Sequence, residues 1–155
     1  MRVADVMTEA KVTDSPADTL RAAASRMWQQ QTGSLLIMDG GRLVGIVTER
    51  DVMKAVARGQ DVDATPVTEI MTKDVLTVGP DSSLHEAARQ MASRWIRHLP
   101  VVEGGDEGAV IGMVSQRDLV GVLAALDPDP QGVELASDQL VRDQRLVRIE
   151  QGDLD

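Results

Sequence analysis

Two short stretches carry residue types that could recognise a ligand. Thr48-Glu49-Arg50-Asp51 and Ser115-Gln116-Arg117-Asp118 each place a hydroxyl three residues before a carboxylate. A carboxylate can accept hydrogen bonds from two adjacent hydroxyls, and a hydroxyl at a helix start can donate to an anion. The same spacing is also that of a capping box, in which the two side chains satisfy free amides at a helix start. The residues alone leave both interpretations open.

The composition argues against several other kinds of site. The chain has no cysteine and only two histidines, His85 and His98, which are too few for the usual zinc sites. It contains neither a Gly-x-Ser-x-Gly motif nor a His-Glu-x-x-His motif nor a phosphate loop, so we expect no catalysis and no required cofactor. The net charge of −9 disfavours nucleic acid and anionic membranes as partners. With neither a signal-peptide pattern nor a membrane-length apolar run, the sequence predicts a cytoplasmic protein.

The elements that would position the two stretches occur twice along the chain. The segment at residues 3–8, Val-Ala-Asp-Val-Met-Thr, returns 64 residues later as Val-Thr-Glu-Ile-Met-Thr at residues 67–72. At the same shift, four apolar residues with the i, i+3, i+4, i+7 spacing of one helical face are identical in both copies. These are Leu20, Ala23, Ala24 and Met27, which correspond to Leu84, Ala87, Ala88 and Met91.

Short apolar runs follow each predicted helix. Residues 35–38 and 99–102 are predicted as buried strands, and glycine-containing turns at 39–42 and 103–108 connect them to second strands at 43–48 and 110–115. A helix should then start at each hydroxyl-x-x-Asp stretch. Because about 60 residues are marginal as an independent domain, the sequence predicts an α/β (α+β) fold of two β-α-β-β-α units that pack with pseudo-twofold symmetry into one module.

The predicted boundaries place the first unit at residues 1–63, the second at 64–126 and a tail at 127–155. The tail begins with Asp127-Pro128-Asp129-Pro130, where each proline biases its predecessor away from helix and so ends the last helix. The rest of the tail interleaves apolar and charged residues, and we expect it to be partly ordered.

The duplicated unit resembles the CBS family over about residues 3–125. The motifs that carry this resemblance are Asp5-Val6-Met7-Thr8 with its copy at 69–72, Arg97-His98-Leu99-Pro100-Val101-Val102, and the strand-to-helix stretches at 45–51 and 112–118. The resemblance implies a stand-alone pair of CBS motifs, or Bateman module, that serves regulation and signal transduction. It would sense an adenosyl ligand (AMP, ADP, ATP, S-adenosylmethionine or NAD) between the repeats, form a homodimer and regulate a separate protein.

The resemblance also implies roles for the residues of two clefts. Asp51 and Asp118 would receive the ribose hydroxyls of a ligand, and Thr48 and Ser115 would donate to its phosphate. The segments Met7-Thr8-Glu9 and Met71-Thr72-Lys73 would each line the adenine pocket of the opposite cleft. Alternatively, these segments would serve only strand packing.

A basic pair, Arg97-His98, would contact phosphate in the cleft closed by Asp118, whereas the first repeat has Gly33-Ser34 at the corresponding positions. Arg50 and Arg117 would be further phosphate contacts, or solvated residues of a first helical turn. A structural or dimerisation module that does not bind nucleotide is the alternative function. The candidate ligand-binding residues are Thr8, Glu9, Gly33, Thr48, Arg50, Asp51, Thr72, Lys73, Arg97, His98, Ser115, Arg117 and Asp118.

Overall fold

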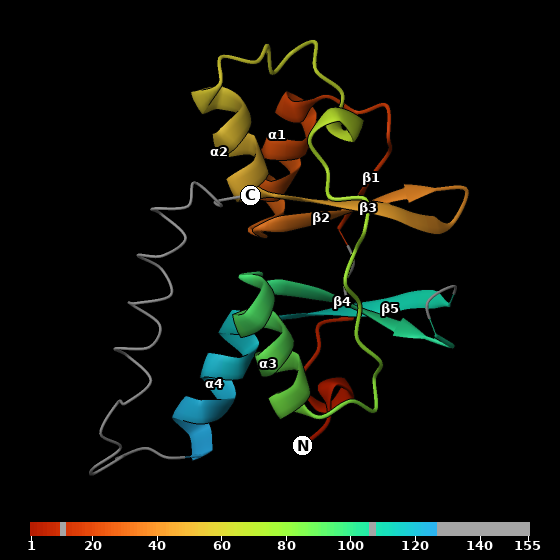
Figure 1. The fold of residues 1–155 in the computed structure, drawn as a ribbon, viewed down its shortest axis with the longest axis vertical. Helices are drawn as coiled ribbons and strands as arrows, with labels where there is room; N and C mark the ends of the chain where they lie inside the picture. The colour runs from red at the N-terminus through yellow and green to blue at the C-terminus, as the bar shows by residue number, and fades with distance from the viewer. Residues whose placement is uncertain (10–11, 106–107, 127–155) are drawn as a thin grey trace. The chain divides into compact units, whose positions relative to one another are not determined.

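The computed structural model describes residues 1–9, 12–105 and 108–126, so the predicted tail at 127–155 lies outside the described residues. One compact body runs from Met1 to Val122 and holds both repeats. Among the described residues, four α-helices and two small β-sheets form an α/β architecture, as predicted (Figure 1).

The first repeat contains a three-stranded sheet and two helices. The strands β1 (Thr13–Asp14), β2 (Ser34–Asp39) and β3 (Arg42–Thr48) lie in the order β1-β2-β3, with β1 parallel and β3 antiparallel to β2. The predicted turn between β2 and β3 is confirmed, since Gly40 and Gly41 take positive φ values of 55° and 82° that a two-residue hairpin turn requires. Helices α1 (Leu20–Gln30) and α2 (Glu49–Ala57) complete the repeat.

The second repeat has the same helices and hairpin, but its described residues form no strand that corresponds to β1. Strands β4 (His98–Glu103) and β5 (Ala109–Ser115) pair antiparallel between α3 (Leu84–Arg94) and α4 (Gln116–Leu126). At the position that β1 takes in the first repeat, the described chain has a single parallel bridge between Val78 and Val101 of β4. In the first repeat the Leu36 amide donates to the Val12 carbonyl at 3.0 Å. Pro100 stands at the position of Leu36 and has no N–H to donate, which shortens this pairing.

The helical faces predicted from the repeat are buried. Leu20, Ala23 and Met27 of α1 lie in the core of the first repeat. Their counterparts Ala87 and Met91 of α3 lie in the core of the second, with Leu84 partly buried beside them. The 3.6-residue spacing therefore identified the packed side of both helices.

The core of each repeat is completed by residues that precede the first helix of the other repeat. Val3, in the short 3-10 helix Val3–Asp5, is buried in the core of the second repeat, and Val67, in the 3-10 helix Val67–Glu69, is buried in the core of the first. The chain then continues along the other repeat's last strand: Thr8 exchanges backbone hydrogen bonds with Met113 of β5, each 2.9 Å long. Residue 72 pairs in the same way with residue 46 of β3. The two repeats are thus interlocked through residues 3–8 and 67–72, which we call the leading segments.

Both crossings depend on a glycine. A Cβ added at Gly112 would lie 2.8 Å from the Thr8 carbonyl oxygen, which is closer than real Cβ atoms approach. At Gly45 an added Cβ would overlap the side chain of Met71 and lie 3.2 Å from the Thr72 carbonyl oxygen. Each leading segment can therefore lie against its strand only because that strand has no side chain at the crossing.

The two sheets also pack directly on each other. A shared hydrophobic cluster joins Leu36 and Ile46 of the first sheet to Val102 and Val110 of the second. Figure 1 shows the β2–β3 and β4–β5 hairpins facing each other, with α1 and α2 on the outer side of one and α3 on the outer side of the other. The starts of α2 and α4 follow directly from the paired hairpins, and this brings the hydroxyl-x-x-Asp stretches to the junction between repeats.

Candidate functional site

The two hydroxyl-x-x-Asp stretches form capping boxes. The Asp51 carboxylate Oδ2 accepts from the Thr48 amide at 2.7 Å and from the Thr48 hydroxyl at 2.9 Å, while the hydroxyl oxygen accepts from the Asp51 amide at 3.4 Å. The second repeat has the same geometry, with both Ser115-to-Asp118 Oδ2 distances at 2.7 Å and the return bond at 3.4 Å. Both helix starts are therefore held by their own side chains.

This geometry leaves one oxygen of each carboxylate for a ligand. Among the described residues, Oδ1 of Asp51 and Oδ1 of Asp118 accept no hydrogen bond, and both side chains are only half-buried. The hydroxyl protons of Thr48 and Ser115, by contrast, are already donated to the carboxylates. The arrangement can accept hydrogen bonds from ligand hydroxyls, whereas donation from Thr48 or Ser115 to a phosphate would require the hydroxyl to turn.

The leading segments lie beside the strands that end at these motifs. Thr72 and Lys73 are exposed next to β3, which leads to Asp51, and Thr8 and Glu9 are exposed next to β5, which leads to Asp118. Each motif is therefore flanked by polar residues from the other repeat.

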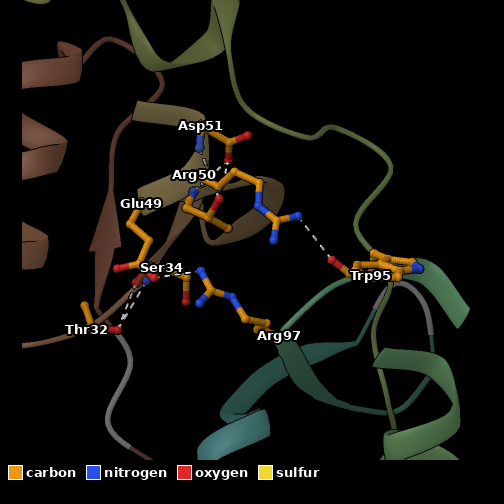
Figure 2. Close-up of polar contacts among 8 residues, drawn as sticks. Thr32, Ser34, Glu49, Arg50, Asp51, Trp95 and Arg97 are labelled. Atoms are coloured by element: carbon orange, nitrogen blue, oxygen red, sulfur yellow. Dashed lines mark hydrogen bonds and ion pairs between the residues drawn. The ribbon is translucent and has the colours of Figure 1, made fainter. Parts of the chain in front are cut away.

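Arg97 joins the two repeats. Its carbonyl accepts from the Gln116 amide at 2.8 Å, which places its backbone at the start of α4, near Asp118. Its side chain points the other way: the guanidinium Nη2 lies 2.7 Å from Oε1 of Glu49, the first residue of α2 (Figure 2). The sequence assigned Arg97 to the Asp118 cleft, and the structure directs its charge toward the first repeat.

Arg50 makes a second contact across the junction. Its Nη1 donates to the Trp95 carbonyl at 3.5 Å, and Figure 2 shows the side chain reaching from α2 to the turn before β4. Trp95 ends α3 in a left-handed conformation with φ 55°, which turns its carbonyl toward the first repeat. Arg117, the counterpart in the second repeat, is exposed and has no hydrogen bond or ion pair within the described part of the chain.

Gly33 and His98 meet at the centre of the junction. A Cβ at Gly33 would lie 3.2 Å from Cε1 of His98 and 3.4 Å from Cδ of Glu49. Burial, helped by the positive charge of Arg97, lowers the pKa of His98 below its usual value. His98 therefore contributes a neutral imidazole, and the positive charge of the junction comes from arginines such as Arg97 and Arg50.

Sequence reasoning missed Glu49 as a member of this site. Within the sequence Glu49 is only one residue of the repeated stretch, and a charged residue at the first position of a helix is usually solvated. The signal that could have found it is the difference between repeats, since the second repeat has the neutral Gln116 at the same position.

The fold and the duplicated capping motif define an internally repeated α/β module with two equivalent helix starts at its junction. A family model for the CBS domain matches residues 3–58 and again 67–125, so the chain belongs to the CBS domain family and carries two copies of the domain. Among curated proteins, the CBS domain-containing protein YhcV of Bacillus subtilis is 37% identical over 118 residues, covering 76% of this chain and 81% of its own length.

Two solved structures show what similar pairs hold. The CBS domain pair of protein MJ0100, solved in complex with 5′-methylthioadenosine and S-adenosyl-L-methionine, is 28% identical with a TM-score of 0.75, covering 82% of this chain and 98% of that one. The CBS domain protein PAE2072 of Pyrobaculum aerophilum, solved in complex with AMP, is 28% identical with a TM-score of 0.72, covering 83% of this chain and 100% of that one.

Within residues 1–9, 12–105 and 108–126, no helix is long and apolar enough to cross a membrane. The same ranges bring no three His, Cys, Asp or Glu side chains together in a way that could hold a metal ion.

Proposed function

We propose that this protein is a non-catalytic regulatory module that binds an adenosyl ligand between its two CBS repeats. The candidates are AMP, ADP, ATP, S-adenosylmethionine and NAD, and no cofactor is required. The observation that carries the proposal is the pair of motifs at the junction, each with one carboxylate oxygen left to accept hydrogen bonds. The adenosyl ligands of the MJ0100 and PAE2072 pairs support the same ligand class.

The proposed chemistry follows from the two free oxygens. Oδ1 of Asp51 or Asp118 accepts the ribose hydroxyls, which are adjacent donors that a carboxylate suits. Residues Thr8 and Glu9, or Thr72 and Lys73, flank the adenine of the ligand. These roles extend the placement described above, in which each leading segment lies beside the other repeat's strand.

A phosphate on the ligand would meet the cationic side of the junction. Arg97 supplies a planar guanidinium suited to phosphate oxygens, and His98, Arg50 and the helix starts add donors around it. Gly33 leaves room beside His98, because no side chain stands there. Arg117 is exposed and can turn toward a ligand in the Asp118 cleft.

Regulation would follow from the interlocked architecture. A ligand shifts a conformational equilibrium only by the difference between its affinities for the two states. Groups from both repeats surround the proposed clefts, so a bound ligand changes how tightly the repeats are held together. We propose that a separate protein reads this change. We further propose that the protein acts in the cytoplasm, without nucleic-acid or membrane partners.

A structural dimerisation module is the second candidate, and two observations favour it. The capping boxes account for both hydroxyl-x-x-Asp stretches without any ligand. In addition, the side chains of Met53 and Val56 on α2 are 66% and 59% exposed, and that of Val120 on α4 is 56% exposed. Exposed apolar residues of this kind are typical of helix faces that pair with another subunit. A homodimer is compatible with both candidates.

Thermal unfolding with each ligand distinguishes the two functions. A ligand at one hundred times its Kd stabilises the native state by about 2.7 kcal/mol, which raises the Tm of a protein of this size by several degrees. The adenosyl module predicts such a rise with at least one of the five ligands. The dimerisation module predicts no rise with any of them, together with a dimer by light scattering.

A further inference from the structure

We propose that Glu49 sets the charge preference of the junction by acting as an internal anion on Arg97. A ligand phosphate must compete with the Glu49 carboxylate for the guanidinium, so Glu49 disfavours phosphorylated ligands relative to uncharged ones. This inference rests on the proposed function, in which Arg97 meets the phosphate of an adenosyl ligand.

The ion pair between Arg97 and Glu49 is short, but its exposure lets another anion compete for Arg97. Arg97 Nη2 lies 2.7 Å from Glu49 Oε1, and the two side chains are 44% and 58% exposed (Figure 2). An ion pair as exposed as this contributes little to stability, because water competes for both partners. A phosphate offers the same guanidinium more oxygens and more charge than a carboxylate. Displacement of Glu49 from Arg97 is therefore feasible without unfolding any element.

A displaced Glu49 carboxylate remains close to the phosphate. The Glu49 amide donates to the Gly33 carbonyl at 3.0 Å, which fixes the first residue of α2 to the junction. The carboxylate carbon lies next to Gly33 and His98, the same space that a phosphate on Arg97 would approach. A carboxylate and a phosphate in the same space repel each other, so Glu49 weakens the binding of a phosphorylated ligand even after its ion pair with Arg97 has opened.

The second repeat lacks this arrangement. Gln116 replaces Glu49, and Gly33 occupies the position of Arg97. The backbone contacts are nevertheless equivalent: the Gln116 amide donates to the Arg97 carbonyl at 2.8 Å, just as the Glu49 amide donates to Gly33. The protein's own second repeat therefore shows that glutamine fits this helix start, and Glu49→Gln is the conservative test.

The test measures AMP and adenosine binding to the full-length protein by isothermal titration calorimetry. In Glu49→Gln, the Kd for AMP should fall about threefold to tenfold, since one nearby negative charge is removed, while the Kd for adenosine stays within about twofold. Glu86→Gln is the matched control: Glu86 also lies in a first helical turn and pairs with an arginine, Arg89, at 3.4 Å, but it belongs to α3. It should change neither Kd.

Arg97→Met provides the second variant, because methionine retains an unbranched stem of similar length and lacks the charge. In this background Glu49→Gln should improve AMP binding relative to adenosine by less than it does beside Arg97, because only the repulsion between Glu49 and the phosphate is left to relieve. The inference is overturned if Glu49→Gln shifts both ligands equally or weakens AMP, and the proposed function then still stands. If neither ligand binds the wild-type protein, nor any other adenosyl ligand, the proposed function and this inference both fail.

Discussion

Gly112→Ala tests the interlocked arrangement of the two repeats. The new Cβ would lie 2.8 Å from the Thr8 carbonyl oxygen, whereas ordinary contacts begin at 3.4 Å, so the atoms must separate by about 0.6 Å. The Thr8 backbone cannot yield freely, since two hydrogen bonds of 2.9 Å hold it to Met113. Overpacking of this kind costs about 1–3 kcal/mol. We therefore expect the Tm to fall by about 3–10 °C.

The assay is thermal unfolding followed by circular dichroism, with Gly121→Ala as the matched control. Gly121 lies inside α4, and a Cβ there meets nothing within 4 Å. Alanine favours a helix interior over glycine by about 0.5–1 kcal/mol, so the control should be at least as stable as the wild type. A Gly112→Ala protein that unfolds within 1 °C of the wild type (about 0.3 kcal/mol) would refute the close crossing of the leading segment.

Three further predictions concern charge and burial. Asp14→Val should leave stability unchanged or raise it, because Asp14 is buried where the second repeat has Val78, and Arg26, whose side chain is 40% exposed, keeps water and the Thr13 carbonyl as partners. Burial, helped by Asp18, raises the pKa of Asp14 to about 6, so ionisation of Asp14 destabilises the wild-type protein only above that pH. The Tm advantage of Asp14→Val should therefore shrink as the pH falls from 7 toward 4, and a loss of several degrees at pH 7 would contradict this. Because the pKa of His98 is lowered in the folded protein, the unfolded chain takes up the proton first, and the free energy of unfolding should fall as the pH drops below about 6.5. His98→Gln should reduce this loss of stability, whereas the exposed control His85→Gln should not. Equal pH dependence of stability in the two variants would contradict the prediction.

Much of the fold was predictable because the chain repeats itself. The shared apolar positions of α1 and α3 identified the buried helical faces, and the glycine turn at 39–42 identified the first hairpin. Local spacing suffices for such features, since helix faces and tight turns depend on neighbouring residues. The capping geometry of Thr48 and Ser115 likewise follows from spacing alone.

Features that depend on distant residues were harder to predict. The single bridge at Val78 arises from Pro100, whose missing amide matters only once the two segments are known to pair. Asp14 has the residue type of a surface position, although Val78 at the same repeat position indicates a buried site. The direction of the Arg97 side chain depends on Glu49, 48 residues away, and no local pattern encodes that contact.

Binding of an adenosyl ligand through Asp51 or Asp118 is the proposed role of the junction between the two repeats. The most direct measurement is calorimetric titration of AMP into the wild-type protein, Asp51→Asn, Asp118→Asn and the control Asp81→Asn, whose side chain is 85% exposed and pairs with Arg2. We expect AMP to bind the wild type and the control alike, and at least one cleft variant to bind about tenfold more weakly, as the loss of charged hydrogen bonds to a ligand implies. Equal AMP affinity in all four proteins would contradict a nucleotide site at Asp51 or Asp118. Absence of binding to the wild type by AMP and by every other adenosyl ligand would contradict it as well.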